Sequence, residues 1–154
     1  MQRVTNSILR HDDHILLLKK PRRGWYAFPG GKMERNETIK ESAIREFQEE
    51  TGLTLIDPDV AGIFTFTIFE DESFVQEWMM FTFICETFTG ELTDHCLEGE
   101  LEWVPISQLH QLPMAAGDKQ LLNHIVHSNE ILYGSFSYTT DYDLLESRLD
   151  PSRP

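Results

Sequence analysis

The sequence predicts a mixed α/β fold (α+β), because strand-like runs, a long helix, further strand-like runs and a late helix follow one another. The strand-like runs are rich in β-branched and aromatic residues, which favour strands. The two longer helical segments repeat apolar residues every three or four positions. Since the strands and helices do not alternate one by one, the pattern differs from a simple βαβ repeat.

The N-terminal third begins with two strands and ends in a glycine loop. Val4–Leu9 and Ile15–Lys19 are apolar, and the polar residues 10–14 between them predict a hairpin or two neighbouring strands. Trp25–Phe28 is a short aromatic segment. Pro29–Gly31 is predicted to be a loop, because glycine reaches backbone angles that other residues avoid.

A helix follows this loop. Thr38 and Glu41 have the spacing of a capping box, which marks a helix start. Gly52 stands where a helix often ends in a left-handed residue. Apolar residues recur every four positions and are expected to be buried: Ile39, Ala43 and Phe47.

The second half of the chain returns to strands. Val60–Phe69 and Glu77–Phe88 are predicted strands on either side of an acidic turn. The next predicted elements are a loop (89–100), a strand (Leu101–Val104), a helical turn (Ile106–Leu112) and a helix (Lys119–His127). This last helix is expected to turn Leu121, Leu122, Ile125 and Val126 inward, with His124 and His127 on its surface.

The length of 154 residues predicts one domain, 1–154, in which residues 129–154 form a C-terminal extension. Leu132, Phe136 and Tyr138 fit an alternating strand. Asp141 is a candidate cap for a short helix over 144–149. The extension either extends the sheet, covers a substrate or makes a dimer contact, and the sequence leaves all three open.

Composition excludes several classes of protein. The chain carries a net charge of −13, which argues against binding to long nucleic acid. No apolar run reaches the roughly 18 residues that a membrane span needs, and we expect no signal peptide. Cys85 and Cys96 are expected to be reduced thiols, so the predicted location is cytoplasmic. We expect a monomer or a homodimer.

Residues 31–53 read GKMERNETIKESAIREFQEETGL and contain the strongest functional signal. Glu46, Glu49 and Glu50 stand at i, i+3 and i+4, so a helix places them on one face. Like charges at this spacing repel one another and lower the stability of the helix. We therefore expect a cation to bind between them. Oxygen ligands favour Mg²⁺, with Mn²⁺ as an alternative.

The spacing of this segment is G-x5-E-x7-R-E-U-x-E-E-x-G-U, where U is apolar. It therefore resembles the Nudix box, and the chain resembles the MutT-like branch of the Nudix hydrolase family. The residues that match are Gly31, Glu37, Arg45, Glu46, Phe47, Glu49, Glu50, Gly52 and Leu53. The resemblance implies the Nudix fold, a mixed sheet between helices with the box as a loop–helix–loop.

The resemblance also implies roles for the box residues. Glu46, Glu49 and Glu50 would line the metal site, with Glu49 and Glu50 the firmer ligands and the carbonyl of Gly31 a further one. Glu46 would be the general base, as in MutT-like members, although members differ in which glutamate serves. We therefore count Glu46 and Glu49 as catalytic candidates.

Further roles fall on residues around these glutamates. Glu37 and Arg45 would form a supporting pair, in which Arg45 reaches Glu49 at i+4 and orients it for catalysis. An additional metal ligand often precedes the late strand. Glu98 fits that position, since Gly99 follows it and Trp103 comes five residues later; Glu100 is its competitor, and a solvated acidic loop is the alternative to both.

Two groups of residues are candidates for contacts with a substrate. The first is a basic patch, from which Lys19, Arg23 and Lys32 are candidates for phosphate contacts, unless the patch is only a solvated loop. The second would meet a base: Phe28 belongs to an aromatic segment that either stacks on it or is core. Asp118 either reads the base, as the resemblance suggests, or caps the late helix.

The resemblance thus implies a metal-dependent enzyme that converts a purine nucleoside triphosphate to the monophosphate and pyrophosphate. Oxidised purines such as 8-oxo-dGTP are included, which would make it a nucleotide-pool sanitation enzyme. A guanosine polyphosphate alarmone, a 5′-triphosphate RNA end and ADP-ribose are alternative substrates. A non-catalytic nucleotide sensor is disfavoured, because every box glutamate is present.

Overall fold

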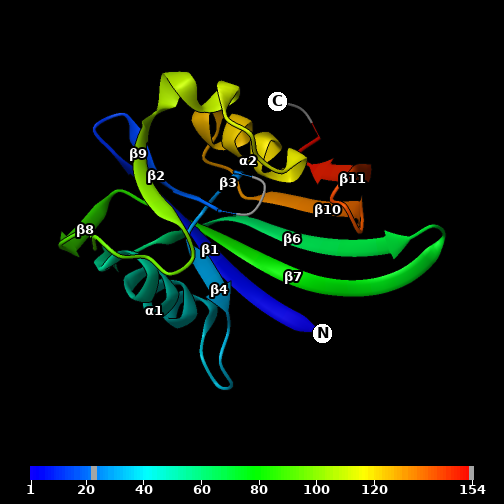
Figure 1. Cartoon of the computed structure of the whole chain (residues 1–154), viewed down its shortest axis with the longest axis horizontal. Coiled ribbons are helices and arrows are strands. Elements are labelled where there is room, and N and C mark those ends of the chain that lie inside the picture. Colours follow the sequence, from blue (N-terminus) through cyan, green and yellow to red (C-terminus); the bar gives the residue numbers. More distant parts are fainter. Residues whose placement is uncertain (22–23, 153–154) are drawn as a thin grey trace.

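The computed structural model describes residues 1–21 and 24–152. A mixed sheet runs through its centre, with helix α1 on one side of it and helix α2 on the other (Figure 1). In these described ranges the sheet has the strand order β11-β10-β6-β7-β1-β2-β3, while β4 pairs with β1 and β9 with β2. A separate small sheet pairs β5 with β8.

The strands are β1 (Gln2–His11), β2 (His14–Lys19), β3 (Tyr26–Ala27), β4 (Gly30–Lys32), β5 (Leu53–Ile56), β6 (Asp59–Glu70), β7 (Ser73–Cys85), β8 (Thr87–Gly90), β9 (Glu100–Pro105), β10 (Leu132–Thr139) and β11 (Leu144–Asp150). The helices are α1 (Ile39–Thr51), the 3-10 helix η1 (Ile106–Gln111) and α2 (Ala116–His127).

Parallel and antiparallel pairs alternate from β11 to β2. β1 and β2 form an antiparallel hairpin, one of the two predicted arrangements, and β1 is parallel to β7. β6 and β7 form a long antiparallel hairpin that projects from the body (Figure 1). β10 then returns to lie parallel to β6. The predicted strand over 77–88 is in fact two strands, β7 and β8, and β7 begins four residues earlier at Ser73.

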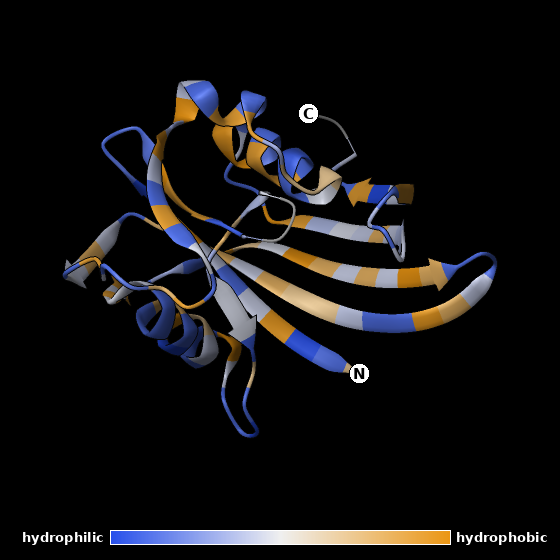
Figure 2. Ribbon diagram, viewed as in Figure 1, coloured by the Kyte–Doolittle hydropathy of each residue, from blue (hydrophilic) through white to orange (hydrophobic). Residues whose placement is uncertain are grey.

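Two apolar cores hold the helices against the sheet. The larger core lies under η1 and α2 and includes Phe64, Phe136 and Leu121. The smaller core lies under α1, where Phe47 packs with Leu16. The strands at the centre are correspondingly apolar, whereas the outward face of α1 is hydrophilic (Figure 2). Neighbouring residues of β1 and β2 enter different cores, Ile8 the larger and Leu9 the smaller, so the two helices cover opposite faces of the sheet, as predicted.

Helix α1 starts and stops as predicted. Thr38 is its N-cap, and the side chains of Thr38 and Glu41 each accept a hydrogen bond from the other's backbone N–H. Gly52 ends the helix at φ 83°, in the left-handed region. Ala43 and Phe47 are buried, while Ile39 is only partly so.

The two glycines before α1 correct a prediction. Gly30 and Gly31 belong to strand β4, not to a loop, and neither has a positive φ. They are required because the chain passes too close to its neighbours for a side chain. A Cβ on Gly30 would lie 2.1 Å from the carbonyl oxygen of Thr5, and one on Gly31 would lie 2.3 Å from Oε2 of Glu46.

The C-terminal extension adds strands to the sheet. Leu132, Phe136 and Tyr138 are buried on alternate positions of β10, as predicted. The helix predicted over 144–149 is wrong: this segment is strand β11, paired antiparallel with β10. Asp141 therefore caps no helix and lies in the turn between the two strands.

Helix α2 departs from its prediction in three details. It begins at Ala116, and its N-cap position is Ala115, so Asp118 lies in the first turn and is not the cap. Val126 was expected inward but is 39% exposed. His124 was expected on the surface but is buried, with Nε2 2.6 Å from the carbonyl oxygen of Glu130. None of the described helices is long and apolar enough to cross a membrane.

Candidate active site

Arg45 donates hydrogen bonds to three glutamates of the box. Its guanidinium donates two of them to Glu37, from Nε to Oε2 at 2.6 Å and from Nη2 to Oε1 at 2.9 Å. Nη1 donates to Glu46 at 2.9 Å and to Glu49 at 3.2 Å. One cation therefore holds three carboxylates, and the fork geometry of arginine fixes their directions.

The electrostatics of this cluster follow from these bonds. The hydrogen bonds from Arg45, and then the one from the backbone N–H of Glu34, lower the pKa of Glu37 to about 2. The same contact with Glu37 raises the pKa of Arg45. Both side chains are therefore charged at any ordinary pH, and the supporting pair predicted from the sequence is formed.

Glu50 faces a different environment from Glu49, although they are neighbours in the chain. The Glu49 side chain is 55% exposed, whereas Glu50 turns toward the sheet and accepts a hydrogen bond from the N–H of Gly30 at 3.2 Å. Burial, and then the charges of Glu98 and Glu46, raise the pKa of Glu50 to about 7. Glu50 is thus a half-buried carboxylate beside two others and needs a cation to be stable as an anion.

The donor chemistry of this place fits a hard divalent cation. It offers the carboxylates of Glu46, Glu49, Glu50 and Glu98, and the backbone of Gly31 lies directly against Glu46. In the described ranges no three acidic, histidine or cysteine side chains are gathered closely enough to hold an ion as they are oriented here. The Glu98 side chain is 59% exposed and has room to turn toward it, whereas Glu49 would first exchange its 3.2 Å hydrogen bond with Arg45 for the cation.

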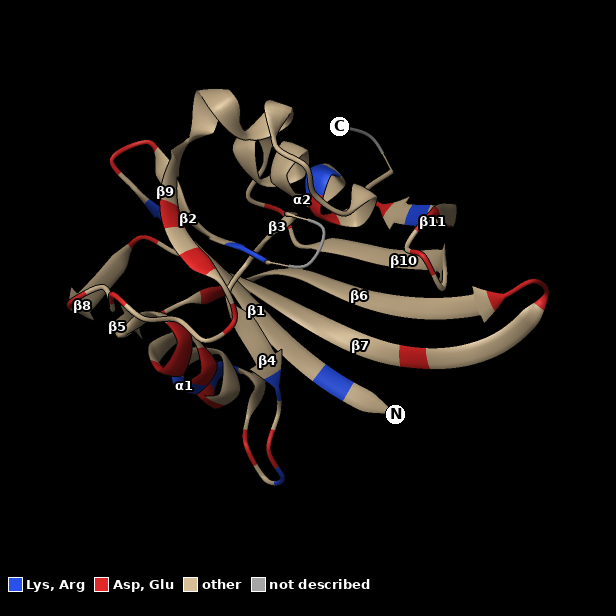
Figure 3. Ribbon diagram, in the orientation of Figure 1, with Lys and Arg blue, Asp and Glu red and all other residues tan. Residues whose placement is uncertain are grey.

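The acidic loop before β9 meets the box through Lys20. Nζ of Lys20 lies 3.8 Å from Oε2 of Glu98, and the charges of both residues act on Glu50. Glu100, the competitor of Glu98, stands at the start of β9 and acts instead on Tyr26. Acidic residues line α1 and this part of β9 (Figure 3). Of the two candidate extra ligands, Glu98 is the one beside Glu50.

The candidate phosphate residues are spread out. Lys19 is exposed at the end of β2, with Nζ 6.0 Å from the ring centre of Tyr26. Lys32 is exposed on β4, and its carbonyl oxygen accepts a hydrogen bond from Arg45 at 3.2 Å. Arg23 lies outside the described residues. Lys20, which was not among these three candidates, pairs with Glu98 at 3.8 Å, and its charge acts on Glu50.

A cavity of about 500 Å³ opens beside Lys20. Its lining comes from four separate segments of the chain: Lys20, Trp25, Tyr26, Ala27, Ala115, Asp118, Thr140 and Tyr142. Tyr26 is fixed by a hydrogen bond from its hydroxyl to Glu102 at 2.9 Å. Phe28, the candidate for base stacking, is instead 5% exposed in the larger core. Its neighbours Trp25 and Tyr26 line the cavity in its place.

Asp118 is the acidic residue on the cavity wall. The residue is partly accessible, yet its carboxyl group is surrounded by protein atoms, and this burial raises its pKa to about 7. The hydroxyl of Tyr138 lies close by and accepts a hydrogen bond from the N–H of Gly117 at 2.9 Å. Asp118 can therefore hold a proton near neutral pH and donate a hydrogen bond into the cavity.

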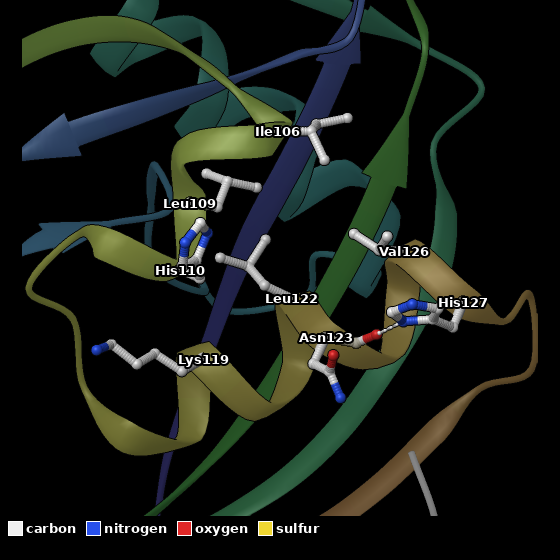
Figure 4. A pocket seen from close by; sticks show the side chains of 8 residues that line it. All are labelled: Ile106, Leu109, His110, Lys119, Leu122, Asn123, Val126 and His127. Carbon is white, nitrogen blue, oxygen red and sulfur yellow. Dashed lines mark hydrogen bonds between the residues drawn. The ribbon is translucent and has the colours of Figure 1, made fainter.

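A second, smaller cavity of about 260 Å³ lies between η1 and α2 (Figure 4). Its floor is apolar, with Leu109 and Leu122, and its rim carries His110, Lys119 and His127. Nδ1 of His127 lies 2.8 Å from the carbonyl oxygen of Asn123, one turn earlier in α2. None of the box residues lines this cavity, so it is separate from the carboxylate cluster.

Comparison with known proteins identifies the class that this fold and carboxylate helix define. The sequence model of the NUDIX domain matches residues 1–125, and the chain belongs to the Nudix family. It is accordingly a hydrolase that acts on phosphorus-containing anhydrides, and Nudix hydrolases generally use divalent cations. The predicted mixed fold and the predicted family are confirmed.

Two of the similar proteins match this chain over nearly its whole length, and a third matches part of it. The chain is 47% identical over 151 residues to the uncharacterized Nudix hydrolase YvcI of Bacillus subtilis, covering 98% of this chain and 96% of that protein. The structure is similar to a crystal structure of MutT protein from Bacillus halodurans, with a TM-score of 0.96, 50% identity and full coverage of both chains. An ADP-ribose pyrophosphatase of Methanocaldococcus jannaschii is 31% identical over 112 residues, covering 71% of this chain and 64% of that protein.

Proposed function

We propose that this protein is a pyrophosphohydrolase that converts a purine nucleoside triphosphate to the monophosphate and pyrophosphate with Mg²⁺, or with Mn²⁺. The observation that carries the proposal is the position of Lys20. It lines the aromatic cavity and also lies 3.8 Å from Glu98 in the carboxylate cluster. A nucleotide can thus place its base in the cavity and its phosphates past Lys20 toward Glu50.

Each residue then has a task in the reaction. Glu46, Glu49, Glu50 and Glu98 would hold the cation, which would neutralise phosphate oxygens and lower the pKa of a bound water. Glu46 is held between Arg45 and Gly31 and accepts the proton of the attacking water. Arg45 keeps Glu46 in a fixed direction through a 2.9 Å hydrogen bond, so that this carboxylate needs little reorganisation at the moment of reaction.

The cavity supports a purine as the base. Trp25 and Tyr26 offer aromatic faces, and stacking on each contributes about 1–3 kcal/mol. A protonated Asp118 can donate to an acceptor atom on the edge of the base. Oxidised purines such as the base of 8-oxo-dGTP belong to the same class. We place this activity in the cytoplasm and treat the protein as a monomer or homodimer.

ADP-ribose is the second candidate, because the relative from Methanocaldococcus jannaschii is named an ADP-ribose pyrophosphatase. It also carries a purine, and cleavage of its diphosphate would use the same glutamates. The two candidates differ in their products, since only a triphosphate releases pyrophosphate.

The test is a product assay with Mg²⁺ and with Mn²⁺ on GTP, dGTP, 8-oxo-dGTP, ppGpp, ADP-ribose and 5′-triphosphate RNA. We expect pyrophosphate release, with the highest kcat/KM on one purine triphosphate. Activity confined to ADP-ribose, ppGpp or RNA would refute the proposed substrate but not the hydrolase activity. Tight binding without hydrolysis of any of them would refute the enzyme and favour a sensor.

A further inference from the structure

The hairpin β10–β11 lies beyond the part of the chain that matches the family model, which ends at residue 125. β10 pairs parallel with β6 over its whole length, from Leu132 opposite Gly62 to Thr139 opposite Phe69. This pairing carries the turn after β10, residues 139–143, to the cavity beside Lys20, because Thr140 and Tyr142 both line it. The extension therefore supplies one wall of the cavity in which we place the base.

Tyr138 fastens this wall to helix α2. Its side chain is 1% exposed, and its hydroxyl accepts the hydrogen bond from the N–H of Gly117 at 2.9 Å. A Cβ on Gly117 would lie 2.8 Å from that hydroxyl, so the two segments touch without room for a larger residue. The strand that leads into the turn is thereby bonded to Gly117, the residue before Asp118 in the chain.

The turn itself is organised around Thr139. Its N–H donates to the carbonyl oxygen of Asp143 and its carbonyl accepts from the N–H of Tyr142, both at 2.9 Å. Its hydroxyl accepts from the N–H groups of Asp141 at 3.2 Å and Asp143 at 3.1 Å. Four hydrogen bonds on one threonine fix the direction in which the turn presents its side chains.

Tyr142 is held in an unusual backbone conformation. Its φ is 64°, in the left-handed region that bulky residues avoid, at a cost of about 1 kcal/mol or more. The residue is nevertheless 44% exposed, and its ring lies 5.9 Å from the ring of Tyr138. The backbone conformation by itself would favour glycine or asparagine at this position. A strained tyrosine with an accessible ring on a cavity wall is typical of a binding residue.

We propose that Tyr142 is a specificity-determining residue of the hydrolase, whose ring packs on the base of the bound nucleotide opposite Trp25 and Tyr26. This inference rests on the proposed function, since it needs a nucleotide in the cavity. It makes the C-terminal extension part of the active site: the box cleaves the anhydride, and the extension selects the aromatic group attached to it.

The test compares Tyr142→Ala with Tyr142→Phe and with Leu145→Ala, an exposed residue of the same hairpin that does not line the cavity. Alanine keeps the left-handed backbone cost and removes only the ring. We expect Tyr142→Ala to lower kcat/KM for GTP about tenfold through KM, while hydrolysis of ribose 5′-triphosphate, which has no base, is unchanged. Tyr142→Phe and Leu145→Ala should both resemble the parent. An equal loss on both substrates would overturn the proposal in favour of a structural role.

A binding measurement separates this proposal from the proposed function. Calorimetry with guanosine 5′-[α,β-imido]triphosphate and Mg²⁺ needs no turnover. If Tyr142→Ala weakens binding of this analogue about tenfold, the proposed role of Tyr142 is supported. That holds even if the parent hydrolyses no triphosphate, a result that would refute only the proposed hydrolase activity. If the parent and Tyr142→Ala bind the analogue with equal affinity, or the parent does not bind it, the proposed role of Tyr142 is refuted, whatever the hydrolase activity.

Discussion

The two halves of the site are built in opposite ways. Apart from Glu98, the carboxylate half comes from one stretch, residues 31–53, in which Arg45 reaches Glu37, Glu46 and Glu49 over at most eight positions. The aromatic half comes from four segments that meet only in the folded chain: Lys20, Trp25 to Ala27, Ala115 with Asp118, and Thr140 with Tyr142. Chemistry is thus encoded by local spacing, and recognition by long-range topology. Substitutions in the two halves should accordingly have different effects.

The largest effect is expected in the carboxylate half. Glu49→Gln should lower metal-dependent kcat by about 1,000-fold or more, because the amide cannot supply a charged ligand. The melting temperature should stay within a few degrees, since the Glu49 side chain is 55% exposed. Gln48→Ala, an exposed neighbour on α1, is the control. Near-normal turnover by Glu49→Gln would remove this residue from the site.

Substitutions of the two adjacent glycines, Gly30 and Gly31, should separate effects on catalysis from effects on stability. In Gly31→Ala the new Cβ would lie 2.3 Å from the carboxylate of Glu46, and this side chain can turn away from it. Because Glu46 is then displaced, kcat should fall about 100-fold, while the loss of stability should be small. In Gly30→Ala it meets the backbone oxygen of Thr5 at 2.1 Å, so the chain should lose about 2–4 kcal/mol of unfolding free energy. Kinetics and thermal unfolding of both variants check this, and a reversed ranking would contradict it.

Lys20 joins the two halves, and its removal should have an intermediate effect. Lys20→Ala should raise KM about tenfold with little change in kcat, because a phosphate contact is lost while the box is intact. Lys19→Ala should raise it less, since Lys19 is exposed at the cavity edge. Lys40→Ala, whose partner is Asp57 on the far side of α1, is the control. A larger rise in KM for Lys19→Ala than for Lys20→Ala would reverse our assignment.

The smallest effect concerns stability in the aromatic half. Burial raises the pKa of Asp118 from 3.8 to about 7, so between these pH values the folded state keeps a proton that the unfolded chain releases. Stability from this group is therefore full below about pH 4 and is lost as pH rises through 7. The free energy of unfolding of Asp118→Asn, taken relative to that of the parent, should therefore be about 1–2 kcal/mol higher at pH 8 than at pH 4.

Denaturant unfolding of both proteins at the two pH values measures this difference. Glu37 and Glu50 also titrate abnormally, but they are present in both proteins and cancel in the comparison. A pH-independent difference between parent and Asp118→Asn would show that the carboxyl group is solvated after all.

The sequence was sufficient wherever contacts are local. The capping box of Thr38 and Glu41, the left-handed Gly52 and the pair of Glu37 with Arg45 all depend on residues at most eight positions apart, and all three were predicted. The family followed from the same spacing. The N-terminal hairpin also joins neighbours in the chain.

The errors occurred where distant segments decide the outcome. Gly30 and Gly31 are small because Thr5 and Glu46 press against them, which no local pattern reveals. The apolar residues of 144–149 fit a helix or a strand equally well, and pairing with β10 decided for a strand. Phe28 was expected either to stack on a base or to belong to the core, and only the fold decides for the core. Tyr142 carried no signal, because only the parallel pairing of β10 with β6 brings it to the cavity.

That pairing also has a consequence for the order of folding. β10 and β6 join across a long separation, with Leu132 opposite Gly62, and parallel strands so far apart close slowly. Helix α1 needs only local contacts and the smaller core. We therefore expect pulse-labelled hydrogen exchange during refolding to protect α1 before β10. A chain emerging from the ribosome would then hold its catalytic helix before it has a complete place for the base.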